Sequence, residues 1–410
     1  MPIAVPQPSH STGTLYKGQY QLRQGLTSGQ HEPVESLIQP YPAFPKEVTG
    51  PTVWRREEYI DNPQLWKKEW TPEQIKELEE SYNAFVKTGL DLPQINRETF
   101  PLSQSVTTFL SGIREHIVNG PGFILIKGLP VTEWPIHKSA AIYLAIGTIL
   151  GITVSQNRKG HILGHVKDLG NDPTQIHKVR IYSTSARQFF HTDAADIVGL
   201  LCLAKAKEGG ESDIVSAHHL WNTLQKERPD VAELLTKPDW YFDRKGETSE
   251  GQNEWIKKSV FYWHDGKLIS HYDPYYVKSI TRHVEAGHIP GHSPEQLEAI
   301  QVLEDTAQRL ALHMVLAVGD IQFVADTHVF HARTAYVDYP PPEPRRHLLR
   351  LWLSTPVSEG GWKRPYSDSD YYKRGGIQVD HRRKVEMLSS APSSLVKVNQ
   401  QPETCPLDAE

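Results

Sequence analysis

The sequence predicts a mostly β fold with flanking α-helices, in which short strands close into a barrel or jelly roll buttressed by helices. Helical patterns occupy most of residues 71–150, whereas strand patterns dominate residues 151–215. After a last helical segment, four closely spaced apolar runs follow, at 313–318, 321–325, 329–336 and 347–354. Helices followed by many short strands are typical of barrels and sandwiches that are covered on the outside by helices.

The helices are predicted from their end signals. Thr71-Pro72-Glu73-Gln74 combines an N-cap, a proline in the first turn and a capping box, so a helix is expected to run to Lys87 and stop at Gly89. Ser293-Pro294-Glu295-Gln296 gives the same signal for a helix that ends near Leu310. Further helices are expected at 104–118, 132–150, 217–226 and 229–236.

Two more segments are predicted from their local pattern. The apolar run 122–128 predicts a short strand. His264-Asp265-Gly266-Lys267 predicts a hairpin turn, because Asp-Gly favours the tight turns that join antiparallel strands.

Composition argues against several classes of function. The net charge is −5 and no basic run is present, so no nucleic-acid partner is expected. No stretch approaches about 20 uninterrupted apolar residues, so no membrane span is expected, and the N-terminus lacks the pattern of a secretory signal. The chain has only two cysteines, Cys202 and Cys405, which fits a reducing, cytoplasmic compartment.

The segment Phe189-Phe190-His191-Thr192-Asp193 predicts a metal site. Residues i and i+2 of a strand point to the same face, so His191 and Asp193 can offer an imidazole and a carboxylate to one ion. A second histidine from a distant strand would complete a set that leaves open positions and favours non-haem iron(II). His331 is the candidate, because it lies in the middle of the apolar run Val329-Phe330-His331-Ala332.

The triplet pattern alone is weak evidence. With 20 histidines and 49 acidic residues, roughly two His-x-Asp/Glu triplets arise by chance. His271-Tyr272-Asp273 is the main alternative and His283-Val284-Glu285 is another. Pro274 follows the first of these at once and is poorly tolerated inside a sheet. His191 and Asp193 are preferred because a convincing core strand follows them at 197–203.

His331 has competing interpretations as well. It could be a core histidine bonded to a backbone carbonyl, and His328 or His347 could be the third ligand instead. His328 lies three residues before His331, so on a strand it faces the opposite side. His347 stands at the edge of a basic cluster.

Arg346 and Arg350 lie four residues apart and therefore on one face of a strand. A guanidinium that faces a barrel interior is costly unless it meets an anion, and a carboxylate is its natural bidentate partner. That carboxylate could belong to an Asp or Glu of this chain or to a bound molecule.

Six motifs occur in a characteristic order between about Gly120 and Thr355. They are Gly122-Phe123-Ile124-Leu125-Ile126-Lys127-Gly128-Leu129-Pro130, Phe190-His191-Thr192-Asp193, Gly209-Gly210-Glu211-Ser212, Gly319-Asp320-Ile321-Gln322-Phe323, His331-Ala332-Arg333 and Arg346-x-x-x-Arg350. In this order they resemble the taurine dioxygenase / 2,4-D dioxygenase (TauD/TfdA) family of the clavaminate-synthase-like superfamily, and in particular its larger fungal-type members. The fold that this resemblance implies is a double-stranded β-helix, or jelly roll, with helices packed outside it.

The resemblance implies an iron(II)- and 2-oxoglutarate-dependent oxygenase whose iron ligands are His191, Asp193 and His331. Arg346 would bind the distal carboxylate of 2-oxoglutarate, and Ser212, where the family often has Thr, would share it. Iron(II), 2-oxoglutarate and O2 would together oxidise a substrate C–H bond, with release of succinate and CO2. Arg350 matches a position that meets the substrate's anionic group in some relatives, so a small carboxylate, amino acid or sulfonate is expected as substrate.

Two features depart from the pattern of the family. The segment before the distal histidine usually carries an Asn pair and here reads Ala325-Asp326, which puts the contacts around the ligands in doubt. The segments 1–50 and 356–410 exceed the compact bacterial members. The first is rich in Pro, Gly, Ser and Gln and is expected to be a loosely ordered arm, and the second a C-terminal extension.

The expected organisation is one catalytic domain at 51–355 with an insert at about 216–312 that forms part of the substrate pocket and a lid. Two other functions stay open. One is a zinc-dependent hydrolase that uses the same triad, and the other is a non-catalytic binding protein of the same fold. A homo-oligomer is also left open.

Overall fold

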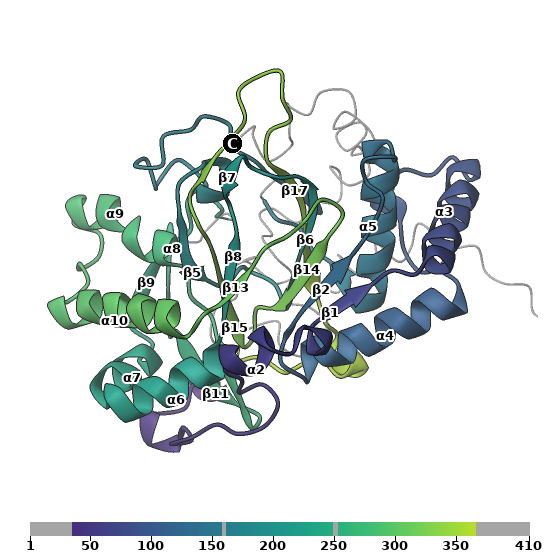
Figure 1. Cartoon of the computed structure of the whole chain (residues 1–410). Helices are drawn as coiled ribbons and strands as arrows, with labels where there is room; N and C mark the ends of the chain where they lie inside the picture. Colours follow the sequence, from purple (N-terminus) through teal and green to yellow (C-terminus); the bar gives the residue numbers. More distant parts are fainter. Residues whose placement is uncertain (1–34, 158–160, 249–252, 366–410) are drawn as a thin grey trace, which may run out of the picture.

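The computed structural model describes residues 35–157, 161–248 and 253–365. Two β-sheets lie at its centre, with one group of helices on each side of them (Figure 1). The mostly β character with flanking helices is therefore as predicted. No helix within the described ranges has the length and apolar character that crossing a membrane requires.

The larger sheet has seven strands. Their order is β1-β2-β14-β6-β17-β3, with β4 also paired to β17. Neighbours run antiparallel except β1 and β2, which are parallel. The strands are β1 (Lys67–Glu69), β2 (Phe123–Lys127), β3 (Ile152–Thr153), β4 (Leu163–Val166), β6 (Ile197–Ala204), β14 (Ile321–Ala325) and β17 (His347–Ser354).

The smaller sheet has four antiparallel strands in the order β13-β8-β15-β5, so β5 is an edge strand. They are β5 (Gln188–His191), β8 (Ser212–Ser216), β13 (Leu312–Met314) and β15 (Val329–Arg333). In the described part of the chain three antiparallel strand pairs are also present: β7 (Glu208–Gly209) with β16 (Tyr336–Val337), β9 (Trp240–Asp243) with β10 (Trp255–Lys258), and β11 (Phe261–His264) with β12 (Lys267–Ser270).

The helices form two groups that are far apart in the sequence. The N-terminal group comprises α2 (Arg56–Ile60), α3 (Pro72–Lys87), α4 (Gln104–Val118) and α5 (Ile136–Leu150), of which α3 to α5 lie beside the larger sheet (Figure 1). The second group lies within the predicted insert and comprises α6 (Ala217–Glu227), α7 (Pro229–Thr236), α8 (Pro274–Lys278), α9 (Thr281–Glu285) and α10 (Pro294–Leu310). The described residues also form six 3-10 turns: Glu35–Leu37, Tyr41–Ala43, Pro63–Leu65, Leu92–Gln94, Ile181–Ser183 and Val357–Glu359.

Local end signals predicted several elements correctly. Both hydrogen bonds of the capping box form at Thr71, and the same motif forms at Ser293. Asp265 and Gly266 both have positive φ, at 50° and 71°, as a tight hairpin turn between β11 and β12 requires.

Two expectations need correction. The third helix begins at Ile136 rather than near Thr132, because Pro135 disfavours a helical conformation for the residue before it. Residues 167–187 contain no strand, although the stretch 151–215 was expected to be mostly β. Gly170, Asn171, Asp172 and Pro173 are turn-forming residues, which accounts for the long connection between β4 and β5.

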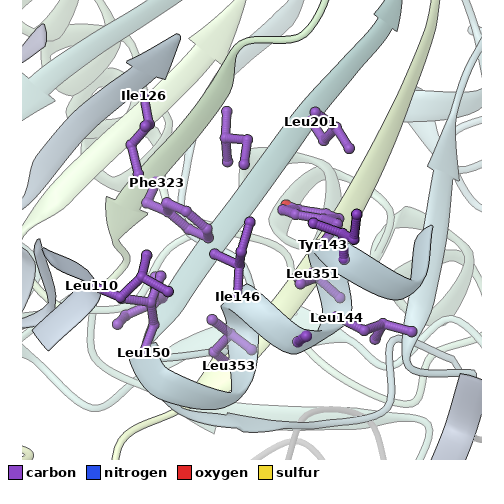
Figure 2. Close-up of a cluster of buried hydrophobic side chains, with 14 of the residues drawn as sticks. Leu110, Ile126, Tyr143, Leu144, Ile146, Leu150, Leu201, Phe323, Leu351 and Leu353 are labelled. Carbon is purple, nitrogen blue, oxygen red and sulfur yellow. The ribbon is translucent and has the colours of Figure 1, made fainter. Parts of the chain in front are cut away.

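Three apolar layers hold the sheets and helices together. One lies between the N-terminal helices and the outer face of the larger sheet, where Tyr143 and Ile146 of α5 meet Phe323 and Leu351 (Figure 2). Gly199 of β6 makes this packing close, since a Cβ there would lie 2.5 Å from both the Phe323 ring and the Tyr143 hydroxyl. The second layer lies between the two sheets, and the third between the smaller sheet and the second group of helices.

The part of the N-terminal segment that the structure describes packs on α6. Phe44 is buried beside Trp221, and the Asn222 side chain bonds the backbone of Val48 in both directions. Residues 1–34 and 366–410, which make up most of the predicted arm and extension, lie outside the described residues.

We expect Leu351→Ala to lower the free energy of unfolding by about 2–5 kcal/mol, because it opens a cavity under α5 where the side chain is fully buried. Leu297→Ala is the matched control, since 56% of the surface of Leu297 is exposed to solvent. It should change stability by no more than about 0.5 kcal/mol. Urea unfolding followed by tryptophan fluorescence measures both, and equal effects would show that the α5 layer does not stabilise the fold as described.

Candidate active site

The three predicted ligand side chains meet between the two sheets. The antiparallel register of β5 and β15 sets His331 directly opposite His191, and their ring centroids lie 4.1 Å apart. Asp193 follows just beyond the end of β5. Its carboxylate oxygens lie 4.0 Å from His191 Nε2 and 3.9 Å from His331 Nε2. One donor atom from each residue falls within 4.8 Å of the others, which is close enough for the three to share one ion.

Both histidines are oriented through Nδ1. His191 Nδ1–H donates to the Phe189 carbonyl oxygen at 2.9 Å, and His331 Nδ1 lies 3.3 Å from the Asp326 carboxylate. Burial, together with the nearby positive charge of His331, lowers the pKa of His191 to about 3. His191 is therefore neutral and its Nε2 carries no proton, but the Gln188 amide nitrogen lies 2.9 Å from this atom and must give way when Nε2 binds a metal. Such contacts to the second ring nitrogen fix the tautomer and orientation of metal-binding histidines.

The Asp326 carboxylate contacts two of the ligand residues, Asp193 and His331. Its Oδ2 accepts the backbone N–H of Asp193 at 2.7 Å, while Oδ1 faces His331. Burial raises the pKa of Asp326 to about 6, although the charge of His331 works in the opposite direction. Burial alone would lower the pKa of His331, but the Asp326 and Asp193 carboxylates outweigh it and raise that pKa.

Asp193 is held from the larger sheet. Trp352 Nε1–H donates to its Oδ2 at 2.9 Å, and Arg350 Nη1 lies 3.5 Å from the same oxygen. Burial would raise the pKa of Asp193, but Arg350 and the two histidines lower it. The carboxylate is therefore kept ionised.

Arg350 is engaged by the chain itself. Its Nε–H donates to Gln156 Oε1 at 2.8 Å, and its guanidinium lies between the rings of Tyr182 and Trp352, 4.5 and 4.8 Å from their centroids. Of the partners that the sequence left open for this guanidinium, the structure shows a carboxylate of the chain itself, since Arg350 pairs with the metal-facing carboxylate of Asp193.

Arg346 and Ser212 line the same chamber as the triad. Arg346 is 5% exposed and lies just before β17, stacked on Tyr336 at 5.0 Å. Its Nη2–H donates to the Gly210 carbonyl at 3.1 Å, and Gly210, at φ 78°, lacks the Cβ that would meet the guanidinium at 2.7 Å. Ser212 Oγ donates to Gln322 Oε1 at 3.0 Å.

The alternative histidines have other contacts. His271 Nε2 lies 3.0 Å from Lys258 Nζ, and Asp273 caps α8 instead of joining His271. His328 stacks on Trp362, and His347 lies 2.7 Å from His165. Within the described residues, no second group of three His, Cys, Asp or Glu side chains converges as the triad does.

Several residues at the site were not predicted. Trp352 shares a strand face with Arg350, so the two-residue period of β17 could have indicated it. Gln188, whose amide nitrogen lies 2.9 Å from His191 Nε2, is three residues before His191, so the period of a regular strand would not have indicated it; the pairing of β5 with β15 shifts register between these residues. Gln156 has no local signal. Arg333 lies two residues after His331 on β15, so the same period could have indicated it. Arg333 lines the chamber and is buried with Nε and Nη1 unpaired, and burial beside Arg346 lowers its pKa to about 10.

The sequence matches the model of the Taurine catabolism dioxygenase TauD, TfdA family over residues 88–352. The chain belongs to this family. The expected class, a non-haem iron(II) 2-oxoglutarate-dependent dioxygenase, is thereby confirmed.

Individual relatives agree with this assignment. FR-33289 synthase of Streptomyces rubellomurinus is 30% identical over 333 residues, which span 80% of this chain and 95% of the relative. The taurine hydroxylase-like protein SAT17 of Stachybotrys chartarum is 29% identical over 286 residues, which span 68% and 72%.

Solved structures show a related fold. Asparagine oxygenase in complex with Fe(II), 3-hydroxyasparagine and succinate superposes with a TM-score of 0.54 and 16% identity, over 70% of this chain and 93% of that chain. The non-haem iron oxygenase OrfP in complex with Fe, succinate and (3S)-hydroxy-L-Arg gives 0.51 and 13%, over 70% and 94%.

We expect Asp326→Asn to weaken metal binding by roughly 10–100-fold, the usual effect of losing a group that orients a ligand. An amide has one acceptor oxygen and no charge, so a side chain that keeps the bond to the Asp193 N–H would present its NH2 group, in place of a carboxylate oxygen, to His331 Nδ1. Anaerobic titration with iron(II) or cobalt(II) measures the change, and circular dichroism checks the fold. The control is Asp305→Asn on the exposed face of α10, which should bind metal as the unaltered protein does. Equal affinities in the two variants would contradict the orienting role.

Proposed function

We propose that this dioxygenase oxidises a C–H bond of a small anionic substrate and converts 2-oxoglutarate and O2 to succinate and CO2. The observation that carries the proposal is that the triad, Arg346 and Ser212 all line one chamber. In this proposal the two facing sheets form the double-stranded β-helix expected for the family, within one catalytic domain at 51–355.

We assign the metal to His191, Asp193 and His331. The donor set fits iron(II), because two imidazoles oriented through Nδ1 and one ionised carboxylate face a common point. When bound, iron(II) would supply the redox chemistry that couples 2-oxoglutarate decarboxylation to substrate oxidation. The protein's part is to hold these three side chains in place and to exclude water from the chamber.

We assign the distal carboxylate of 2-oxoglutarate to Arg346. No acidic side chain of the described chain forms an ion pair with this buried guanidinium, and its Nη1 has no hydrogen-bond partner there. An unpaired buried guanidinium is costly, so the arrangement favours a bound anion over the internal pairing that the sequence left open. Ser212 stands beside it and would add one hydroxyl donor after releasing Gln322.

Arg350 has a mixed role in this proposal. Nε and Nη1 hold Gln156 and Asp193, so its first task is to keep the metal-facing carboxylate ionised and oriented. Nη2 is left to meet an anion beside the metal, either the C1 end of 2-oxoglutarate or the anionic group of the substrate. The zinc-hydrolase alternative gives no use to the unpaired Arg346, and no observation favours it.

His191→Ala and His331→Ala should each abolish turnover and lower iron(II) affinity by more than about tenfold, since each removes a ligand. His271→Ala is the matched control, because it removes a buried histidine outside the triad and should keep iron binding. Anaerobic addition of iron(II) and 2-oxoglutarate should produce a weak visible charge-transfer band in the unaltered protein and in the control. Tight zinc binding without 2-oxoglutarate-dependent O2 uptake would favour the hydrolase.

Arg346→Leu should raise the concentration of 2-oxoglutarate needed for half-maximal succinate release by at least about tenfold, because a buried charge-assisted pair is lost on one side. Ser212→Ala should act in the same direction but more weakly, since it removes a single hydrogen bond to a charged group. Arg345→Leu, at the exposed neighbour, is the control. If Arg346→Leu behaves like this control, the co-substrate site lies elsewhere.

A further inference from the structure

We propose that Arg333 is a second co-substrate-binding arginine, whose guanidinium holds the distal carboxylate of 2-oxoglutarate together with that of Arg346. The inference rests on the proposed function and deepens it, because it adds a residue to the site formed by Arg346 and Ser212. It also makes the distal carboxylate of the 2-oxo acid the group that the protein selects.

The position of Arg333 follows from the strand that carries His331. Residues i and i+2 of a strand face the same side, and Arg333 of β15 lines the chamber as His331 does. On the neighbouring strand, Ser212 of β8 lies directly opposite Arg333 in the antiparallel register and lines the chamber too. The arginine is therefore fixed by the strand that carries a metal ligand and lies beside the hydroxyl assigned to the co-substrate.

Arg333 and Arg346 meet at one aromatic ring. The centre of the Tyr336 ring lies 4.8 Å from the guanidinium carbon of Arg333 and 5.0 Å from that of Arg346. Both side chains are buried and line the chamber. Two like charges are thus held near one another with little access to water, which is unfavourable unless negative charge lies beside them.

The described chain does not supply that negative charge. Within the described ranges, no acidic side chain forms an ion pair with Arg333 or Arg346. Asp338, which accepts the backbone N–H of Arg346, directs its other oxygen to Arg345, and Asp168 also pairs with Arg345. A bound anion is therefore the partner that the two guanidiniums lack.

The unsatisfied donors match one carboxylate in number. Nε and Nη1 of Arg333 and Nη1 of Arg346 are buried without a hydrogen-bond partner in the part of the chain that the structure describes. The Ser212 hydroxyl is a fourth donor atom. A carboxylate has two oxygens with about four acceptor positions, so it can accept one hydrogen bond from each of these atoms. Arg346 and Ser212 alone would leave Nε and Nη1 of Arg333 unsatisfied.

The remaining nitrogen of Arg333 holds the guanidinium in place. Nη2–H donates to the carbonyl oxygens of Thr184, at 3.0 Å, and of Ala186. These two residues precede β5, so the contact also ties their segment to β15. The competing explanation of Arg333 is this structural tie alone.

Substitutions at Arg333 separate the two explanations. Arg333→Gln removes the charge but keeps an NH2 donor, and Arg333→Lys keeps the charge but not the planar, bidentate donor. Arg309→Gln is the control, because 52% of that side chain is exposed on α10, where it pairs with Glu227.

The experiment uses the full chain, loaded anaerobically with iron(II) and titrated with one of two 2-oxo acids. One is 2-oxoglutarate and the other is 2-oxopentanoate, which has the same number of carbon atoms but no distal carboxylate. The charge-transfer band reports the binding of either acid. Titration with cobalt(II) in the absence of a 2-oxo acid reports the metal site, and circular dichroism reports the fold.

We expect Arg333→Gln to raise the half-saturating concentration of 2-oxoglutarate at least about tenfold, because one side of a buried charge-assisted pair is lost. Arg333→Lys should lie between Arg333→Gln and the unaltered protein, and Arg309→Gln should match the unaltered protein. The binding of 2-oxopentanoate should not change in Arg333→Gln, since this acid has no group for Arg333. Cobalt(II) affinity should be the same in all forms.

A double-mutant cycle with Arg346→Leu tests whether the two arginines bind the same group. Residues that bind one carboxylate are energetically coupled, so the loss in the double variant should differ about twofold or more from the product of the two single losses. If Arg333→Gln does not fold, Arg333→Lys replaces it in the cycle and in the comparison of the two acids.

Two failures are distinguishable. Absence of the 2-oxoglutarate band in the unaltered protein would overturn the proposed function. If the band is present, three results would overturn the role of Arg333 while leaving that function intact: 2-oxoglutarate binding in Arg333→Gln equal to that in Arg309→Gln, an equal loss for both 2-oxo acids, or single losses that multiply without coupling.

Discussion

The antiparallel pairing of β5 with β15 brings His191 and His331 face to face, and the other parts of the site are arranged around this register. The side-chain period of a strand is two, so a slip of one residue would turn one of these imidazoles out of the chamber. The register is secured because β15 also pairs with β8 over its whole length, from Val329 to Arg333. The same pairing places Ser212 of β8 opposite Arg333, and so brings the hydroxyl into the chamber.

The charged side chains of the site differ in the partners that hold them. Asp193 and Arg350 satisfy each other, and Trp352 and Gln156 hold the pair in place. Arg346 belongs to the same segment, but among the described residues its guanidinium has a backbone carbonyl and an aromatic ring as partners and no carboxylate. Two arginines four residues apart therefore have different tasks, because only one of them has a carboxylate within reach. Because of that difference, we favour a bound anion over a carboxylate of the chain as the partner of Arg346.

Sequence reasoning succeeded where the signal is local. Capping boxes, the Asp-Gly turn and the apolar strand runs depend on neighbouring residues, and the ends of α3 and α10 follow from them. His191 and Asp193 form a local pattern too, and they were preferred over His271 and Asp273 because a core strand follows them, whereas Pro274 follows the alternative pair. The start of α5 was misplaced because the signal at Thr132 was given more weight than Pro135.

Long-range contacts could not be predicted in this way. Gln156 meets Arg350 across 194 residues, and Asp326 meets the backbone of Asp193 across 133. No periodicity of a single segment indicates such pairs, since the fold alone brings them together. The sequence showed Asp326 in a segment where the family usually has an Asn pair. The effect of this difference depends on the atoms that the Asp326 carboxylate faces, which the sequence does not give. A carboxylate, unlike the expected Asn, can accept from both ligand segments at once.

The segment 216–312 is tied to the metal site through the free edge of β5. An edge strand leaves backbone N–H groups without a strand partner, and these must be satisfied elsewhere. Here Phe189 N–H donates to the Tyr275 hydroxyl at 3.3 Å, and Phe190 N–H to Glu304 at 3.1 Å. Just beyond the strand, Thr192 N–H donates to the Tyr272 carbonyl.

The strand that carries His191 is therefore completed by residues of the segment 216–312, namely Tyr272, Tyr275 and Glu304. A change that displaces α8 or α10 would also release the backbone of β5. The packing of the segment and the geometry of the metal site are thus physically coupled at this edge, and substitutions of solvent-facing side chains in the segment should be tolerated better than substitutions of the groups that bind β5.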